Sequence, residues 1–349
     1  MSVKTKVIAV LTSLGVVTGV FYFRSRQTTT PILNVYTWSS YFPDSIISEF
    51  TRETGIEVRL SYFSSNEELF SKLKAGATGF DIIQPSDYMV RTMQRNGMLV
   101  SLDHSKLPNL SHLDDYYRHL PYDPQLKYSV PFTWGTTGIA VNTRRVKVPA
   151  EGVPWHFLIE SSDPKHTSLL DDAREVFTAF LLSSGQPFGT HDPATLKVIQ
   201  ARVQESIPKI LTFTSEPKQL LLRGELTIAH IFSADGIQAH MTNPDIEYFI
   251  PLEGGTLWTD NFAIPTTATH PFEAHRFIDY FLNPDNALKL ITENHLSTPN
   301  ATAKDRLPKA ITANPNLYPP PEILARMHFM EDPEESLVLL NRLWTELKS

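Results

Sequence analysis

Short apolar runs alternate with amphipathic stretches along the first third of the chain. In the stretch 44–54, Ile46, Ile47 and Phe50 fall on one helical face, and Gly55 follows as a typical helix terminator. The pattern predicts strands at 32–36, 56–62 and 81–84, with helices at 44–54 and 67–75 between them. This alternation is typical of a doubly wound α/β fold with a mainly parallel sheet.

A second α/β set follows a long strand, rich in threonine and glycine, at 128–142. That strand could carry the chain from one lobe to another, and a strand at 257–265 could return it. The stretch between them predicts a strand ending at Leu170, helices from Asp172 and Asp192, and a strand at 226–232. Beyond it, the pattern predicts an amphipathic helix with Phe272, Phe277 and Phe281, a proline-rich surface segment at 308–321, and a final helix at 334–348.

Composition describes a folded protein of about two domains. The chain has 349 residues, of which 41% are hydrophobic and 20% charged. Its formal net charge is -7, and residues 31–349 carry -11 because the first 30 residues hold four basic and no acidic side chains. An acidic body would repel phosphates, which argues against nucleic acid as a partner. It suits a cationic partner.

The N-terminus resembles an export signal. Lys4 and Lys6 precede an apolar run at 7–23, which Arg24 ends. The run is at the short edge of what spans a bilayer, and no clear Ala-x-Ala cleavage site follows it. We therefore expect residues 1–30 to be a signal peptide or a signal anchor. The body would then lie in the periplasm, either free or tethered to the inner membrane.

Cysteine and histidine usage excludes several kinds of chemistry. The chain has no cysteine, which excludes disulfides, thiolate zinc sites, cysteine nucleophiles and lipid attachment through an N-terminal cysteine. Its 12 histidines are scattered without a metal-binding arrangement such as His-Glu-x-x-His. We expect neither a cofactor nor a metal.

The segment from Asp171 to Phe177 brings carboxylates to the start of a predicted helix. Asp172 and Glu175 are three residues apart, so both point the same way near the positive end of the helix dipole. A cationic ligand would offset two such neighbouring charges. The alternative is structural: Asp171 or Asp172 caps the helix, and Arg174 is a surface charge. On these residues alone, the cap is the better interpretation.

Loops at predicted strand ends combine aromatic rings with polar groups. In sheets of this type, ligands bind beyond the carboxyl ends of the strands. A cation gains about 0.5 to 2 kcal/mol on a desolvated aromatic face, and about 1.5 to 3 kcal/mol from a charge-assisted hydrogen bond. Singly, each ring is more often a core or rim residue, but together they suit an aliphatic amine. The side chains concerned are Trp38, Ser39 and Tyr41, then Ser86 and Tyr88, then Trp258 and Asp260.

Several segments, in order and at near-constant spacing, resemble the spermidine/putrescine-binding proteins of bacterial polyamine ABC transporters. The most specific of them is Asp171-Asp-Ala-Arg-Glu-Val-Phe177. The resemblance runs from about residue 32 to the C-terminus. The other segments are Tyr36-Thr-Trp-Ser-Ser-Tyr41, Phe50-Thr-Arg-Glu-Thr-Gly-Ile-Glu-Val58, Pro85-Ser-Asp-Tyr88, Gly254-Gly-Thr-Leu-Trp-Thr-Asp260 and Thr298-Pro-Asn300.

The resemblance implies a fold and a function. The fold would be α/β, the two-lobed periplasmic-binding-protein fold, in which each lobe is a doubly wound mixed sheet with flanking helices and the lobes close around a hinge. We expect an N-terminal lobe of residues 31–140 and 261–303 and a C-terminal lobe of residues 141–260 and 304–349. The protein would be a monomer that performs no chemistry and hands a polyamine to an ABC permease.

Residue by residue, the resemblance also implies a binding site. Its polyamine-contacting positions fall on Trp38, Ser39, Tyr41, Ser86, Tyr88, Asp172, Glu175, Ser215, Phe232, Trp258 and Asp260, of which Ser215 is a weaker match. The chain departs from the family at four positions: Phe232 replaces a tryptophan, Ser40 a glutamate, Leu296 a tyrosine and Met330 a glutamine. Each departure removes a polar group or a larger ring, which bears on ligand length and affinity.

Other classes of function are less well supported. A hydrolase would use Asp171, Asp172 and Glu175 as acid and base, but these carboxylates lie at one helix end, whereas glycoside hydrolysis needs carboxylates that flank the substrate. A receptor for another cation, or a polyamine sensor without a transport role, fits the same residues. The sequence does not separate delivery from sensing.

Overall fold

The computed structural model describes residues 30–39, 41–160, 163–330 and 334–348. Residues 1–29 of the predicted signal peptide or signal anchor (1–30) and the family departure at Ser40 lie outside these residues. Within the described part of the chain, no helix is both long enough and apolar enough to cross a membrane.

The first lobe is built on β1 (Ile32–Trp38), which pairs in parallel with β2 (Glu57–Phe63) and β3 (Ile82–Ile83). α2 (Asp44–Thr54) buries Ile46 and Phe50 and ends as predicted at Gly55, whose φ of 71° is a left-handed conformation that glycine adopts without the steric cost of a Cβ. The remaining helices of this segment are α3 (Asn66–Lys74), α4 (Asp87–Arg95) and the short α5 (Asp115–Arg118).

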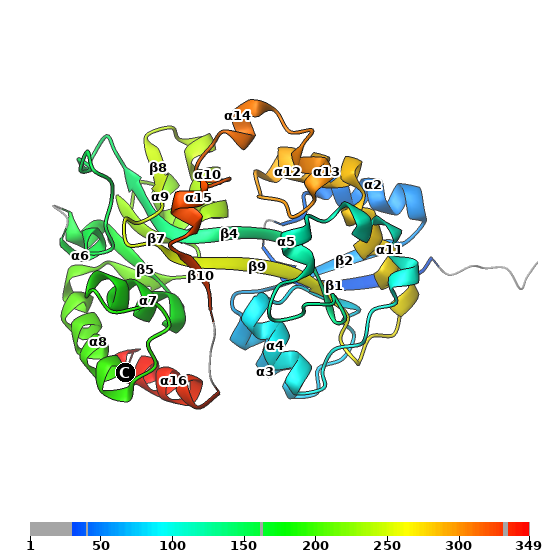
Figure 1. Cartoon of the computed structure of the whole chain (residues 1–349), viewed down its shortest axis with the longest axis horizontal. Helices are drawn as coiled ribbons and strands as arrows, with labels where there is room; N and C mark the ends of the chain where they lie inside the picture. Colours follow the sequence, from blue (N-terminus) through cyan, green and yellow to red (C-terminus); the bar gives the residue numbers. More distant parts are fainter. Residues whose placement is uncertain (1–29, 40, 161–162, 331–333, 349) are drawn as a thin grey trace, which may run out of the picture.

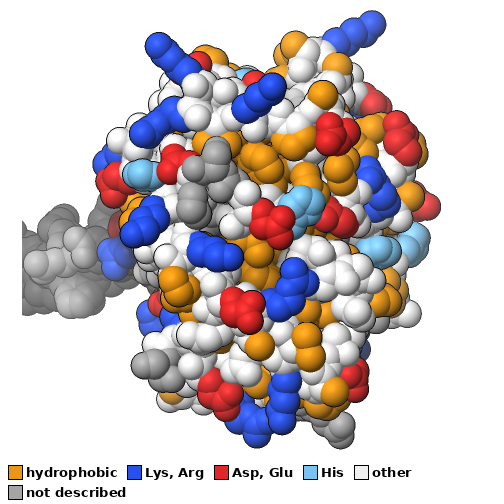
Figure 2. Space-filling model, turned by 90° about the vertical axis from the view of Figure 1, so that its left-hand side faces the viewer, with side chains coloured by type: hydrophobic (Ala, Val, Ile, Leu, Met, Phe, Trp, Pro, Cys, Tyr) orange, Lys and Arg blue, Asp and Glu red, His pale blue; other side chains and the backbone are white. Residues whose placement is uncertain are grey.

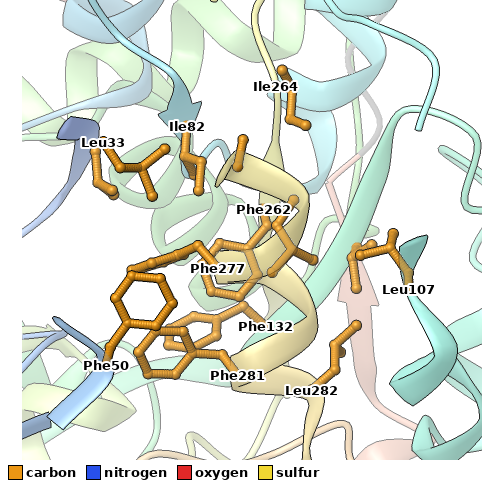
Figure 3. Close-up of a cluster of buried hydrophobic side chains, with 14 of the residues drawn as sticks. Leu33, Phe50, Ile82, Leu107, Phe132, Phe262, Ile264, Phe277, Phe281 and Leu282 are labelled. Carbon is orange, nitrogen blue, oxygen red and sulfur yellow. The ribbon is translucent and has the colours of Figure 1, made fainter. Parts of the chain in front are cut away.

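An aromatic cluster forms the core of the first lobe (Figure 3). Phe277 of α11 (Pro271–Leu282) is fully buried, with its ring centroid 5.1 Å from that of Phe50 and 5.8 Å from that of Phe262. The ring centroids of Phe132 and Phe262 lie 4.6 Å apart. These two residues come from the long strands β4 (Ser129–Asn142) and β9 (Gly255–Ala263). The core therefore anchors both long strands to this lobe.

Two long antiparallel strands, β4 (Ser129–Asn142) and β9 (Gly255–Ala263), run from one lobe to the other (Figure 1). β4 pairs with β9 up to Thr136 and then with β7 (Ile228–Phe232) and β8 (Ile246–Phe249) of the second lobe. A Cβ on Gly135 would lie 2.3 Å from the Trp258 ring, so this crossing requires a glycine. The strand order is β2-β1-β3-β9-β4-β7-β5-β6, where β5 is Thr167–Leu170 and β6 is Thr212–Thr214, and β10 (Met327–Phe329) pairs with β9.

In the second lobe, β7 is antiparallel to β4 and parallel to β5, and β5 is parallel to β6. Its core includes Phe177, Phe180 and Leu343. On its outer face, basic and acidic side chains are interspersed (Figure 2). Its elements are α6 (Phe157–Glu160), β5 (Thr167–Leu170), α7 (Ala173–Ser183), α8 (Pro193–Ser206), β6 (Thr212–Thr214), α9 (Pro217–Leu222), β7 (Ile228–Phe232), α10 (Ser233–Thr242), β8 (Ile246–Phe249) and α16 (Glu334–Lys348).

The last part of the chain visits both lobes. Leu307 and Ile311 pack with Ala287 and Ile291 of α12 (Pro284–Asn294). The chain therefore still lies against the first lobe after residue 304, where we expected the second lobe to resume. The proposed boundaries at 140 and 260 fall inside β4 and β9. The elements here are α12 (Pro284–Asn294), α13 (Ala301–Lys304), α14 (Lys309–Thr312) and α15 (Pro321–Leu324).

Two local expectations are corrected. The sheet is mixed, as the resemblance implies, and not mainly parallel as the alternation of elements alone predicts, because β4 and β9 are antiparallel to each other and β9 is antiparallel to β3. Asp87 and Tyr88, expected in a loop, begin α4, and only Ile82 and Ile83 of the stretch 81–84 form a strand.

Candidate functional site

A cavity of about 340 Å³ lies between the two lobes. All of the site residues predicted from the sequence line it: Trp38, Ser39, Tyr41, Ser86, Tyr88, Asp172, Glu175, Ser215, Phe232, Trp258 and Asp260. Of the family departures, Met330 also lines the cavity, whereas Leu296 is buried in the core of the first lobe. The structure thus brings together residues that are more than 200 positions apart in the chain.

Asp260 is buried at one side of this cavity, with 4% of its surface exposed. Its Oδ1 accepts a hydrogen bond of 2.6 Å from the Ser86 hydroxyl, and its Oδ2 accepts one from the Tyr41 hydroxyl. Asn66 fixes Ser86 in turn, because its amide donates to the Ser86 Oγ at 2.9 Å and its carbonyl accepts from the Ser86 N–H at 3.0 Å. Burial raises the pKa of Asp260 to about 6.

Asp172 and Glu175 form a second acidic group, at the start of α7. Asp172 caps the helix, since its Oδ1 accepts hydrogen bonds from the backbone N–H groups of Arg174 (2.9 Å) and Glu175 (3.1 Å). The same side chain lines the cavity. The cap and the cavity-facing carboxylate, which the sequence offered as alternatives, are therefore one residue.

Glu175 is more deeply buried, with 5% of its surface exposed. Its two carboxylate oxygens accept hydrogen bonds from Thr137 of β4, at 2.9 Å, and Thr256 of β9, at 3.0 Å. Burial and the nearby charge of Asp172 raise the pKa of Glu175 to about 8. Burial and the charge of Glu67 also raise the pKa of Asp172, to about 6, against the opposing effect of Arg174.

Arg174 is not the surface charge that the structural interpretation of the sequence supposed. Only 7% of its side chain is exposed. Its guanidinium pairs with Glu67 of α3 and lies 4.2 Å from the centroid of the Tyr88 ring, and both partners belong to the first lobe. Arg174 therefore joins the two lobes beside the cavity. Asp171 pairs instead with Lys348 of α16, at 2.5 Å.

Aromatic rings form the remaining walls. The Trp38 indole N–H donates to the carbonyl of Gln84 at 3.1 Å, and its ring lies 4.5 Å from that of Phe63. The Trp258 ring meets Phe232 edge-on at 6.0 Å. The Trp258 Nε1 is buried and has no hydrogen-bond partner among the described residues. The walls therefore offer ring surface to an aliphatic chain.

Sequence reasoning missed several cavity residues and supporting residues. Asn66, Asp235, Gln238 and Thr256 line the cavity, and Thr137 holds Glu175. Thr137 and Thr256 lie in strands where threonine is ordinary, so no sequence signal singles them out. Asp235 could have been found from its place three residues after Phe232, at the start of a helix.

The arrangement of Asp172 and Glu175 suits the binding of a cation and not acid–base catalysis. Each oxygen of Glu175 accepts a hydrogen bond from a hydroxyl group and Asp172 caps a helix, but a carboxylate oxygen can accept a further bond, so both groups can still contact a cation. These two carboxylates share one helix end, unlike carboxylates that flank a scissile bond. What the site provides is buried negative charge beside aromatic rings, which matches a desolvated ammonium group.

Comparisons with known proteins place the chain in a family. The sequence pattern of the bacterial extracellular solute-binding proteins matches residues 45–319. The chain belongs to this family. It is 39% identical over 318 residues to spermidine/putrescine-binding periplasmic protein 1 of Haemophilus influenzae, an alignment that covers 90% of this chain and 88% of that protein. It is 32% identical over 319 residues to the spermidine/putrescine-binding periplasmic protein of Escherichia coli, with 91% of each chain covered.

Solved structures agree with this assignment. The spermidine/putrescine ABC transporter substrate-binding protein of Streptococcus pneumoniae superposes with a TM-score of 0.77 at 31% identity, covering 91% of this chain and 98% of that one. The fold of this solute-binding protein is accordingly the α/β, two-lobed fold of periplasmic binding proteins. The Haemophilus influenzae relative is named as a periplasmic binding protein and the Streptococcus pneumoniae structure as an ABC transporter substrate-binding protein; neither name is that of an enzyme.

The raised pKa of Glu175 predicts that the unfolding free energy of the ligand-free protein decreases as pH rises. A carboxylate whose pKa is higher in the folded state than in the unfolded state stabilises at low pH, and this contribution is lost as pH rises through the folded-state pKa of about 8. At about 1.4 kcal/mol per pKa unit, the loss is on the order of a few kcal/mol. Glu175→Gln has no ionisable group at this position. The difference between its unfolding free energy and that of the parent should therefore increase in favour of the variant from pH 5 to pH 9.

Urea denaturation of the ligand-free proteins at pH 5, 7 and 9 measures this difference. Glu57→Gln, at an exposed ion pair on β2, is the matched control. If the difference in unfolding free energy between Glu175→Gln and the parent stays constant with pH, burial does not raise the pKa of Glu175.

Proposed function

We propose that this protein captures a polyamine, spermidine or putrescine, in the cavity between its lobes and delivers it to an ABC permease. The observation that carries the proposal is the pairing of buried acidic groups with aromatic walls. Glu175 and Asp260 are buried, they come from different elements, and their hydrogen bonds come from hydroxyl groups. The names of the relatives support the same ligand class.

The proposed binding mode follows from the chemistry of an alkyl diamine. Ammonium groups would join Asp260 at one side and the Asp172–Glu175 group at the other. The methylenes between them would lie against rings such as Trp38 and Trp258. Each charge-assisted hydrogen bond contributes about 1.5 to 3 kcal/mol, and apolar burial adds roughly 0.8 kcal/mol per methylene.

Of the family departures, two bear directly on this mode. Phe232 and Met330 line the cavity, so a smaller ring and a thioether stand where relatives are expected to offer a tryptophan and an amide. Leu296 is in the core, and its effect on the ligand would be indirect. We also propose that the hinge between the lobes is the pair of crossing strands, β4 and β9, with lobe boundaries at 140 and 260.

Selective binding is the first expectation of this proposal. Isothermal titration calorimetry should show that putrescine, spermidine or both bind, whereas lysine, arginine and neutral sugars do not compete. An amino acid carries a carboxylate that the acidic cavity would repel. A sugar that binds in preference to both polyamines, or no heat with either polyamine, would overturn the proposed function.

The same titration with Asp260→Asn tests the mode. This substitution keeps the shape of the side chain and removes its charge, leaving a ligand ammonium without its partner, which should weaken binding by about 2 to 4 kcal/mol. Asp285→Asn, at an exposed ion pair with Arg306, is the control that should bind as the parent does. Unchanged affinity in the folded Asp260→Asn variant would remove Asp260 from the site.

Location and assembly complete the proposal. The relatives are periplasmic proteins, and we propose export of this chain as a monomer with residues 31–349 in the periplasm. The apolar run at 7–23 is either a cleaved signal peptide or an uncleaved anchor on the inner membrane. Osmotic shock followed by membrane fractionation separates the two, because only an uncleaved anchor leaves the protein with the membranes. Release in soluble form would contradict the tether, and a cytosolic pool would contradict export.

A further inference from the structure

One carboxylate of the cavity already has an ammonium partner within the chain. Asp235, in the first turn of α10, lines the cavity three residues after Phe232. Its Oδ1 lies 2.8 Å from the Nζ of Lys218 in α9. The same Nζ donates to the Oε1 of Gln238, at 2.6 Å, and Gln238 also lines the cavity. Lys218 thus places its charged end between two cavity residues.

This lysine is held in place and is not a mobile surface side chain. Only 14% of its side chain is exposed, against 30% for Asp235. Gln238 is fixed from its other side, since its Nε2 donates to the carbonyl of Asn294 at 2.8 Å. The side chain of Asn294 in turn donates to the backbone carbonyl of Tyr41. A continuous set of hydrogen bonds therefore links Lys218 to the residue that holds Asp260.

Asp235 belongs to the Asp260 side of the cavity. Burial, then the charge of Asp260 and then that of Asp235 raise the pKa of Tyr41, whose hydroxyl donates to Asp260. A ligand that extends past Asp260 on this side would therefore meet Asp235. Asp260 and Asp235 differ in their partners. Hydroxyl groups donate to Asp260, whereas the ammonium of Lys218 pairs with Asp235.

We infer that Lys218 is a specificity-determining residue, a tethered ammonium that competes with a third ligand ammonium at Asp235 and makes the cavity favour diamines over triamines. The inference rests on the proposed function, because it assumes a polyamine in the cavity. A diamine has two ammonium groups, which Asp260 and the Asp172–Glu175 group would bind. The third ammonium of a triamine has to displace Lys218 or lie beside its positive charge, and either costs binding free energy.

Lys218→Met tests the inference, because it keeps an aliphatic side chain and removes the charge. Losing one positive charge strengthens the binding of any cation, so the measured quantity is the ratio of the Kd for spermidine to the Kd for putrescine. Freeing Asp235 for a charge-assisted hydrogen bond should lower this ratio by about tenfold or more. Lys218→Arg should keep the ratio of the parent.

The double variant Lys218→Met/Asp235→Asn has the net charge of the parent and separates a direct effect from a general one. If Lys218 acts through Asp235, the double variant should return the ratio to near that of the parent. Lys289→Met, which removes an exposed lysine paired with Glu49, should leave the ratio unchanged. Thermal denaturation reports folding, and Lys218→Gln serves as the second charge-removing variant if Lys218→Met does not fold.

Calorimetry with putrescine and spermidine distinguishes the outcomes. A ratio that falls in Lys218→Met and recovers in the double variant supports the inference. A parent that binds a polyamine, with a ratio that none of the Lys218 variants moves, overturns the inference and leaves the proposed function standing. A parent that binds neither polyamine overturns the proposed function itself.

Discussion

Burial of the carboxylates of Glu175 and Asp260 at the wall of one cavity is the constraint on which the surrounding structure depends. Removing a carboxylate from water costs several kcal/mol unless hydrogen bonds or opposite charges compensate for the lost hydration. Here the compensation within the protein comes from hydroxyl groups of Thr137 and Thr256 on one side, and of Ser86 and Tyr41 on the other. These donors are neutral, which is why burial still raises the pKa of both acids. A cation in the cavity would complete the compensation.

The crossing strands make this arrangement possible. Trp258 and Asp260 both come from β9, two residues apart, so both side chains leave the same face of the strand. β4 supplies Thr137 to Glu175, and its Gly135 leaves room for the Trp258 ring. Because both strands continue into both lobes, a bend within them would change the width of the cavity while the pairing of β4 with β9 is retained. The Arg174–Glu67 pair, which joins the lobes beside the cavity, would have to break in such a movement.

Local sequence signals predicted those parts of the fold and of the candidate site that depend on local chemistry. Gly55 ends α2 because of its backbone freedom, and the spacing of Trp258 and Asp260 fixes their common face. Residues whose role depends on a distant partner were not predictable in this way. Arg174 looks like a surface charge in a helical pattern, and only the fold reveals Glu67 opposite it. The resemblance implies that Leu296 replaces a tyrosine of the family, yet the structure buries Leu296 in the aromatic core of the first lobe.

The central claim is that a cationic ligand compensates the buried carboxylates of the cavity, and this claim has a direct thermodynamic consequence. With a pKa of about 8, Glu175 is mostly protonated at pH 7 in the ligand-free protein, and an ammonium beside it would lower that pKa. Calorimetry of putrescine and spermidine at pH 7, in buffers of different ionisation enthalpy, counts the protons exchanged on binding. The account predicts the release of up to roughly one proton per ligand, much reduced in Glu175→Gln. Binding of a polyamine without proton release would contradict it.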